Sequence, residues 1–155
     1  MADAEKIPKG YTTVTPYIVV KDAATAIEFY KRAFDATELY RLDDPKGQIM
    51  HAEIKIGNSI VMMTSEMADM KSQSPQTLNG TAVSFMVYVE DVDSAAKKAI
   101  AAGMETLKPV ENQFYGDRTG TFKDPFGHIW TIGTHVEDIP MDLMKQKMNE
   151  MYSKG

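Results

Sequence analysis

Residues 115–135, YGDRTGTFKDPFGHIWTIGTH, contain two short strand patterns that are separated by a tight turn. The turn sequence Asp124-Pro125-Phe126-Gly127 has Pro at its second position and Gly at its fourth, which favours a type I turn. Successive side chains of a strand point to opposite faces, so we expect a hairpin with Trp130 and Ile132 on one face. The other face is then expected to carry Ile129, Thr131, Gly133 and His135.

The rest of the chain shows the same succession of elements twice. A strand at 12–20 and a helix at 23–36, capped by Asp22, are followed by strands at 37–42, 49–56 and 59–64. The second series has a strand at 83–90, a helix that Asp91 begins and Gly103 ends, a strand at 104–111 and the hairpin. Asp91 lies 69 residues after Asp22, and Gly127 lies 70 residues after Gly57. We interpret this as an internal repeat of a βαβββ module.

These boundaries predict an α+β fold in which two βαβββ modules form a cupped mixed sheet around a shared cleft, followed by a C-terminal helix. The parts of this single domain are expected to be a flexible tail at 1–10, the first module at 11–65, a linker at 66–80, the second module at 81–137 and the C-terminal helix at 138–155. In that helix, Met141, Met144, Met148 and Met151 recur at helical spacing. This stripe packs on its own domain, or it forms a dimer contact or a pliable lid.

The segments YGDR, DPFGHIW and THVED resemble the closing part of the glyoxalase/bleomycin-resistance/extradiol-dioxygenase (vicinal oxygen chelate) superfamily, and the PhnB-like branch in particular. The resemblance extends over about residues 12–138. It implies that the modules surround a cleft, and that metal-using members hold their ion with His, Gln or Glu on the first and last strand of each module.

In this chain the positions that correspond to those metal ligands are Thr15, Val61, Ser84 and Thr131. None of these side chains is a competent ligand for zinc, nickel, manganese or iron. A shift of the alignment by one residue reaches no better donor. We therefore expect no metal site and no cofactor, and we rank the metal-dependent activities of the superfamily low.

Composition limits the remaining function classes. The formal net charge of −5 gives no support to nucleic-acid binding, and the absence of Cys excludes disulfides and thiolate chemistry. Neither a long apolar run nor a signal peptide is present, so a cytoplasmic protein that is not in a membrane is expected. Searches for a Walker loop, a dinucleotide fingerprint, a nucleophile elbow and an HExxH motif are negative.

Polar residues on the expected cleft side provide the candidate catalytic groups. His51 and Glu53 are two residues apart on one strand and can form an acid–base couple, or else a surface pair. His135 shares the face of Thr131. The candidate ligand-binding residues are Tyr17, Met63, Met86, Tyr88, Tyr115, Arg118 and Thr131, and Arg118 could equally form an ordinary ion pair.

Three functional hypotheses follow from these residues. The first is a metal-free, homodimeric protein of the bleomycin-resistance type, which sequesters or carries an aromatic or amphipathic small molecule. The second is a glyoxalase-like lyase or isomerase whose site is relocated to His51, Glu53, Arg118 and His135. The third is a non-catalytic regulatory dimer with a vestigial cleft.

Overall fold

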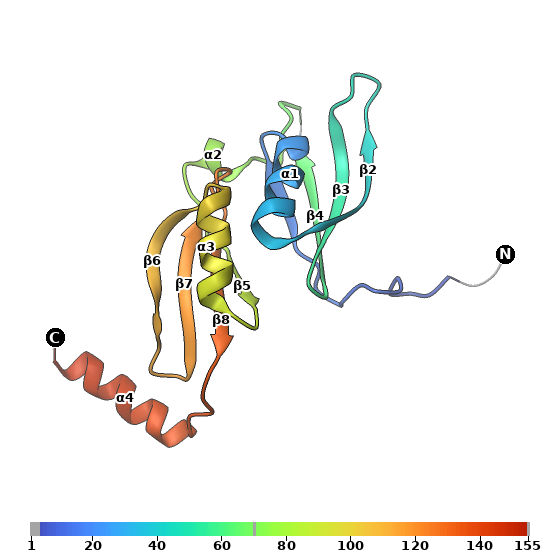
Figure 1. Ribbon diagram of the computed structural model, residues 1–155. Coiled ribbons are helices and arrows are strands. Elements are labelled where there is room, and N and C mark those ends of the chain that lie inside the picture. Colours follow the sequence, from blue (N-terminus) through green and yellow to red (C-terminus); the bar gives the residue numbers. More distant parts are fainter. Residues whose placement is uncertain (1–3, 70, 155) are drawn as a thin grey trace. The chain divides into compact units, whose positions relative to one another are not determined.

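The computed structural model of the chain describes residues 4–69 and 71–154 (Figure 1). The chain divides into two compact units, Met1–Ala82 and Val83–Gly155, and each unit contains one βαβββ module. The expected α+β fold with two modules and a C-terminal helix is confirmed. The outermost part of the expected tail, residues 1–3, and position 70 of the expected linker lie outside the described residues.

The first unit contains one mixed sheet with a helix on one face. Its elements are β1 (Tyr17–Val20), α1 (Ala23–Phe34), β2 (Thr37–Asp43), β3 (Ile49–Ile56), β4 (Ser59–Ser65) and α2 (Pro75–Leu78). The strand order is β1-β4-β3-β2, with β1 parallel to β4 and the other pairs antiparallel. Apolar side chains of β1, β3 and β4 pack under α1, and this buried layer includes Ile18, Val20, Ala52, Ile54, Val61 and Met63.

The second unit repeats this arrangement. Its elements are β5 (Ser84–Tyr88), α3 (Val92–Ala102), β6 (Glu105–Asn112), β7 (Asp117–Lys123), β8 (Ile129–His135) and α4 (Met141–Ser153). The strand order β5-β8-β7-β6 is the order of the first sheet, and α3 lies against one face as α1 does (Figure 1). Phe122, Trp130 and Ile132 are buried on the face toward α3.

Side-chain contacts at the helix starts confirm the internal repeat. Asp22 and Asp91 cap α1 and α3 as predicted, each accepting from a backbone N–H of the first turn. The backbone N–H of Ala23 donates to Ser65 Oγ, and that of Val92 donates to Thr134 Oγ1. Both members of the second pair lie 69 residues after their counterparts in the first, which is the spacing of the two capping Asp residues.

Two of the differences between the expected elements and the structure have local causes. The first strand begins at Tyr17 rather than at residue 12, because Thr12 and Thr15 direct their hydroxyls to the backbone carbonyls of Val14 and Thr12. The expected linker contains the short helix α2, in which Ser74 caps the first turn and Pro75 occupies its first position.

The predicted hairpin turn is confirmed and is organised by Asp124. The N–H of Gly127 donates to the Asp124 carbonyl over 3.1 Å, which closes the turn. Asp124 Oδ1 accepts from the backbone N–H groups of Phe126 and His128, and Oδ2 accepts from Trp130 Nε1 at 2.9 Å. This buried carboxylate therefore joins the turn to the core of the second unit.

Candidate functional site

The sheet face opposite α1, called here the bare face of the first unit, carries a row of side chains that runs across all four strands. Strand register pairs Tyr17 with Met62, Met62 with Glu53, and Glu53 with Tyr40. Directly paired residues point to the same face. We call these four residues the tyrosine row. His51 lies two residues before Glu53 on β3 and therefore shares this face.

Glu53 is the buried centre of this arrangement, with an exposed fraction of 2%. Tyr40 donates its hydroxyl hydrogen to Glu53 Oε1 over 2.7 Å, and Tyr11, from the segment before β1, donates to Oε2. His51 Nε2 lies 3.1 Å from Oε1. Within the described residues, the hydrogen-bond partners of this carboxylate are thus two phenols and one imidazole.

A hydrogen-bonded chain leads from Glu53 to the exposed side chain of Tyr17. The Tyr17 hydroxyl lies 3.0 Å from His51 Nδ1. An ionised carboxylate can only accept, so in the neutral imidazole Nε2 carries the hydrogen toward Glu53, and Nδ1 accepts from Tyr17. The imidazole is thereby held between a buried negative charge and a phenol that is 52% exposed.

The hydrogen bonds keep Glu53 ionised even though it is buried. Burial acts to raise the pKa of Glu53, but donation by Tyr11, Tyr40 and His51 outweighs it, so the pKa is lowered below the ordinary value of 4.5. The pKa values of the neighbouring phenols shift in the opposite direction. Donation to Glu53 raises the pKa of Tyr40 to about 12, and burial together with the charge of Glu53 raises the pKa of Tyr17.

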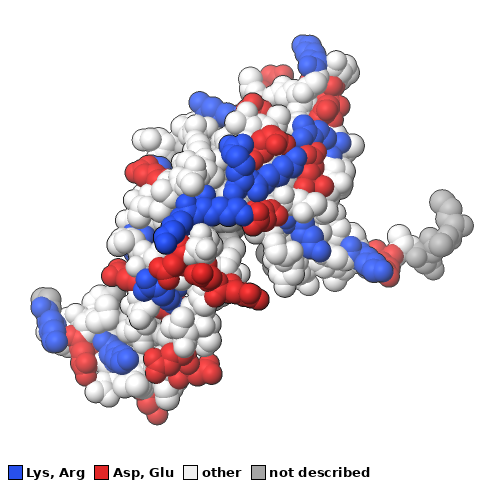
Figure 2. Space-filling model, in the orientation of Figure 1, with Lys and Arg blue, Asp and Glu red and all other residues white. Residues whose placement is uncertain are grey.

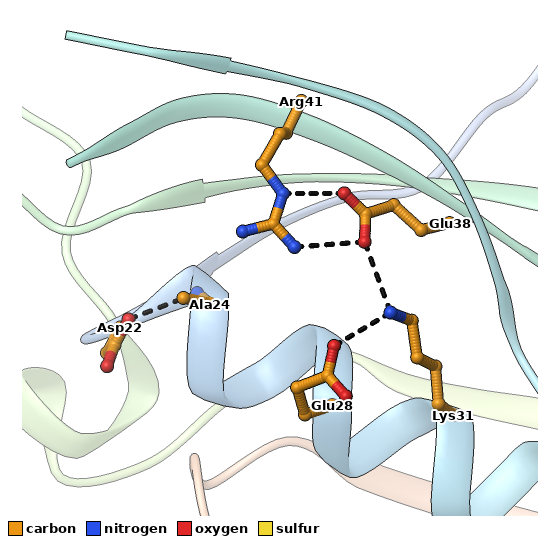
Figure 3. A network of polar contacts seen from close by, with 6 residues as sticks. All are labelled: Asp22, Ala24, Glu28, Lys31, Glu38 and Arg41. Carbon is orange, nitrogen blue, oxygen red and sulfur yellow. Dashed lines mark hydrogen bonds and ion pairs between the residues drawn. The ribbon is translucent and has the colours of Figure 1, made fainter. Parts of the chain in front are cut away.

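On the α1 side of the same sheet, Glu38 has a different set of partners. Arg41 forms two hydrogen bonds with Glu38, at 2.5 and 2.9 Å, and Lys31 lies 3.2 Å away (Figure 3). Donation by Arg41, assisted by Lys31, lowers the pKa of Glu38 to about 2. Glu38 is therefore a carboxylate with two permanent counter-cations, whereas the partners of Glu53 carry no permanent charge.

The bare face of the second unit, opposite α3, carries different chemistry at the same positions. Strand register pairs Met86 with Thr131, Thr131 with Thr121, and Thr121 with Lys108. Met86 is 41% exposed, and its methyl group lies over Gly133, where an added Cβ would stand 2.5 Å from it. This row contains no carboxylate.

His135 lies on the bare face of the second unit between two carboxylates. Its Nδ1 is 2.7 Å from Asp117, and its Nε2 is 2.9 Å from Asp138. Hydrogen bonding to Asp117, and then to Asp138, raises the pKa of His135 above its ordinary value of 6.5. Tyr88, which is 63% exposed, donates to the other oxygen of Asp117 over 2.8 Å.

Three of the residues predicted to lie at the site are on the helix-covered faces. Met63 and its neighbour Val61 pair with residues of β3 that pack under α1, and both are buried. Arg118 pairs with Thr134 and points toward α3, where it binds both oxygens of Asp93 at 2.8 Å. The prediction that Arg118 joins His135 in one site is therefore wrong in its geometry, since the two side chains leave opposite faces of the same sheet.

The predicted residues on the bare faces divide between the two units. Tyr17, His51 and Glu53 are brought together in the first, and Met86, Tyr88, Thr131 and His135 share a face in the second. No sequence pattern pointed to Tyr11 or Tyr40 as members of this group. A bulge between Glu38 and Tyr40 moves Tyr40 onto the bare face, and Tyr11 reaches Glu53 from an irregular segment.

Tyr115 lies in a groove beside α4. The groove has a volume of about 450 Å³ and is lined by Phe114, Tyr115, Met141, Met144, Lys145, Met148 and Asn149. Helix α4 has no buried side chain among its described residues. Its methionine stripe therefore forms one wall of an open apolar groove and packs only partly on its own unit.

The residues present do not fit the metal site that the resemblance implied. Within residues 4–69 and 71–154, no three His, Asp or Glu side chains are arranged to hold a metal ion. On the closing strand of the first unit, register places Met62 on the bare face in place of Val61. The bare-face positions nearest to those of the metal ligands thus carry Met62, Ser84 and Thr131, whose thioether and hydroxyl groups are poor ligands for such ions, and Thr15 lies before β1.

On the face shown in Figure 2, basic and acidic side chains are interspersed. Among the described helices, none combines the length and apolar character that crossing a membrane requires.

Comparisons with known proteins match most of the chain. The model of the family "Glyoxalase/Bleomycin resistance protein/Dioxygenase superfamily" matches residues 11–132. An uncharacterised protein of Mycobacterium bovis is 40% identical over 139 residues, which cover 88% of this chain and 91% of the relative. The crystal structure of TioX from Micromonospora is similar with a TM-score of 0.64 and 25% identity, covering 81% of this chain and 99% of TioX. The PhnB protein from Bacillus cereus has a TM-score of 0.63 and 18% identity, covering 79% and 99% of the two chains.

Proposed function

Because the chain belongs to the glyoxalase/bleomycin resistance protein/dioxygenase superfamily, we propose that it is a metal-free small-molecule-binding protein that sequesters or carries an aromatic or amphipathic compound. One observation carries the proposal. The bare sheet faces present exposed tyrosine and methionine side chains, while the positions expected to hold a metal carry Thr, Met and Ser. Such a surface favours contact with flat, partly apolar molecules over coordination of an ion.

The exposed aromatic groups are fixed in place by polar contacts with neighbouring side chains. Tyr17 is held by His51, and Tyr88 is held by Asp117. Pre-ordered rings lose little conformational freedom when a ligand stacks on them, which favours binding. Met86 beside Tyr88 adds an unbranched side chain that adapts to the outline of a ligand.

A fluorescence titration with Nile red, an uncharged amphipathic aromatic dye, tests this function. We expect the same dissociation constant with and without millimolar EDTA, and about three- to tenfold weaker binding by the variants Tyr88→Ser and Met86→Ser. Tyr152→Ser, an exposed aromatic change on α4, is the control and should leave binding unchanged. Binding that needs an added transition metal, or that persists in both face variants, would contradict the proposal.

A second candidate function is acid–base catalysis, and the Tyr17–His51–Glu53 chain favours it. In this chain His51 accepts from Tyr17 while Glu53 orients the imidazole, so a proton taken up by Tyr17 can pass to His51. Such a relay could remove a proton next to a carbonyl group. Incubation with hydroxyacetone in D₂O should then give deuterium on carbon with the wild type and little with His51→Gln. Equal exchange by the two proteins would exclude this role.

We also propose that the protein acts as a homodimer and that it is cytoplasmic. The open groove beside α4, with Met141, Met144 and Met148 in its wall, supports a contact between copies. Sedimentation equilibrium of the wild type and of Met148→Glu tests the dimer, which the substitution should weaken. A monomeric wild type at micromolar concentration would contradict it.

A further inference from the structure

We propose that the bare face of the first unit binds an organic cation, seated against the rings of Tyr17 and Tyr40 with the Glu53 carboxylate as its counter-charge. This inference rests on the proposed small-molecule-binding function and specifies the class of its ligand. It is carried by the charge of Glu53, by the aromatic rings around it, and by the contrast with the second unit.

The negative charge of Glu53 has no permanent counter-cation among the hydrogen-bond partners described for it. The carboxylate is 2% exposed and receives hydrogen bonds from Tyr11, Tyr40 and His51. Hydrogen bonds from uncharged donors satisfy its oxygen atoms but leave its negative charge in place. Glu38, in the same sheet, is instead neutralised by Arg41 and Lys31 (Figure 3). A cation bound at the bare face would give Glu53 the positive counter-charge that Arg41 and Lys31 give Glu38.

The aromatic rings of Tyr17 and Tyr40 lie on the same sheet face as Glu53. Tyr17 and Tyr40 are 52% and 43% exposed, so their ring surfaces are accessible. Their centroids lie 5.5 and 5.8 Å from that of the His51 ring, which places His51 between the two phenols. The faces of such rings attract cations. Because the Tyr40 hydroxyl donates to a carboxylate, its ring also becomes richer in electrons, which strengthens that attraction.

The corresponding row of the second unit contains neither a carboxylate nor a tyrosine. Lys108 stands where Tyr40 stands, Thr121 where Glu53 stands, and Met86 where Tyr17 stands. A permanent cation at the edge of that row repels a cationic ligand. This row of the second unit therefore lacks the cation-binding chemistry of the first. Elsewhere on the same face Asp117 accepts from Tyr88 but also has His135 beside it, and the raised pKa of His135 favours an imidazolium that serves as the counter-cation of Asp117.

Burial of Glu53 also restricts the kind of cation. A primary ammonium group loses hydration on binding and needs direct hydrogen bonds to acceptor oxygens to replace it. The carboxylate oxygens of Glu53 already accept hydrogen bonds from Tyr11, Tyr40 and His51. An alkylated or delocalised cation, which is weakly hydrated and is held by ring faces and by charge at short range, fits the site better.

A matched pair of probes tests the inference without any mutation. The cation is 2-hydroxyethyl(trimethyl)ammonium, and its uncharged carbon isostere is 3,3-dimethylbutan-1-ol. Two-dimensional NMR of the full-length protein reports both the affinity and the residues that respond. We expect the cation to bind about tenfold more tightly than the isostere, as ring and charge contributions together imply. The shifted signals should be those of Tyr17, Tyr40 and His51.

Substitutions then separate the ring from its hydroxyl. Tyr17→Phe keeps the ring and should bind the cation within about threefold of the wild type, whereas Tyr17→Leu should bind it about tenfold more weakly. Tyr88→Leu makes the same change on the bare face of the second unit and should have no effect. Because Tyr17 is half exposed, these variants are expected to fold.

Three outcomes would overturn the inference: equal affinity for the two probes, undiminished binding by Tyr17→Leu, or no response to the cation up to its solubility limit. Equal affinity would leave the proposed function standing, since uncharged molecules would still bind. A dependence of Nile red binding on a metal would remove the proposed function, whatever the preference between the two probes.

Discussion

Tyr40 and Glu53 are register partners across β2 and β3, and the Tyr40 hydroxyl donates to Glu53 Oε1 over 2.7 Å. This contact belongs to the group of donors that keeps a buried carboxylate ionised on the bare face of the first unit. The Tyr40–Glu53 contact links the stability of the first unit to the cation binding proposed for its surface. Substitution of Glu53 therefore bears on both properties.

Glu53→Gln should destabilise the protein at neutral pH and have a smaller effect in acid. The pKa of Glu53 is lowered in the folded state, so ionised Glu53 stabilises the fold above pH 4.5, and this contribution is lost as pH falls through the folded-state pKa. Loss of charged hydrogen bonds predicts a decrease of about 1–3 kcal/mol in unfolding free energy at pH 7. Urea unfolding at pH 7 and pH 3 measures it, with Glu5→Gln as an exposed control. A difference that does not depend on pH would contradict this account.

Asp124→Ala should destabilise the second unit by about 2–4 kcal/mol, because it leaves buried donors without their acceptor. The affected groups are the backbone N–H groups of Phe126 and His128 and the indole N–H of Trp130. Fluorescence of Trp130 during urea unfolding reports the change, because it is the single tryptophan of the chain. Asp69→Asn, on an exposed segment, should be neutral within about 0.5 kcal/mol. Equal stability of the Ala variant and the wild type would show that the carboxylate does not organise the turn.

Gly116→Ala should be much more damaging than Gly47→Ala, although both glycines have positive φ, +98° and +83°. A Cβ at Gly116 would stand 2.0 Å from the carbonyl oxygen of Glu137, while one at Gly47 would meet nothing within 4 Å. We expect a loss of about 1–2 kcal/mol for Gly47→Ala from backbone strain alone, and at least about 3 kcal/mol for Gly116→Ala. Thermal or urea unfolding compares the two directly. Similar losses would mean that the segment after β8 does not pack on Gly116.

The His135 titration should depend on Asp117. Its folded-state pKa is raised above 6.5, so charged His135 stabilises the fold below that pH, and the contribution is lost as pH rises through the folded-state pKa. Asp117→Asn removes the larger cause and should lower the pKa that NMR titration of the ring protons gives for His135. Asp142→Asn, on α4, is the control. An unchanged titration in Asp117→Asn would place the cause of the shift elsewhere.

Much of the fold could be predicted from the sequence, because the relevant signals are local. The capping Asp residues, the alternation in β3 and the turn at Asp124 each specify their element through neighbouring residues. The alternation of apolar and polar residues in β3 also predicted correctly that His51 and Glu53 lie on the face opposite the helix-covered one. The repeat spacing then related the two modules without any knowledge of their packing.

The errors occur where pairing between strands decides the outcome. In β4 the run Ile60–Thr64 is apolar almost throughout, so no alternation shows which face Met63 occupies, and only its pairing with Ala52 places it under α1. The contact between Arg118 and Asp93 joins residues 25 positions apart on different elements. Tyr11 lies 42 residues from Glu53 in an irregular segment, for which periodicity carries no information.

Native mass spectrometry of the freshly purified, chelator-free protein tests the central claim most directly. The account predicts a noncovalent organic adduct on the folded chain, lost on organic extraction, and no stoichiometric transition metal. One tightly held transition-metal ion per chain, retained through purification, would contradict it.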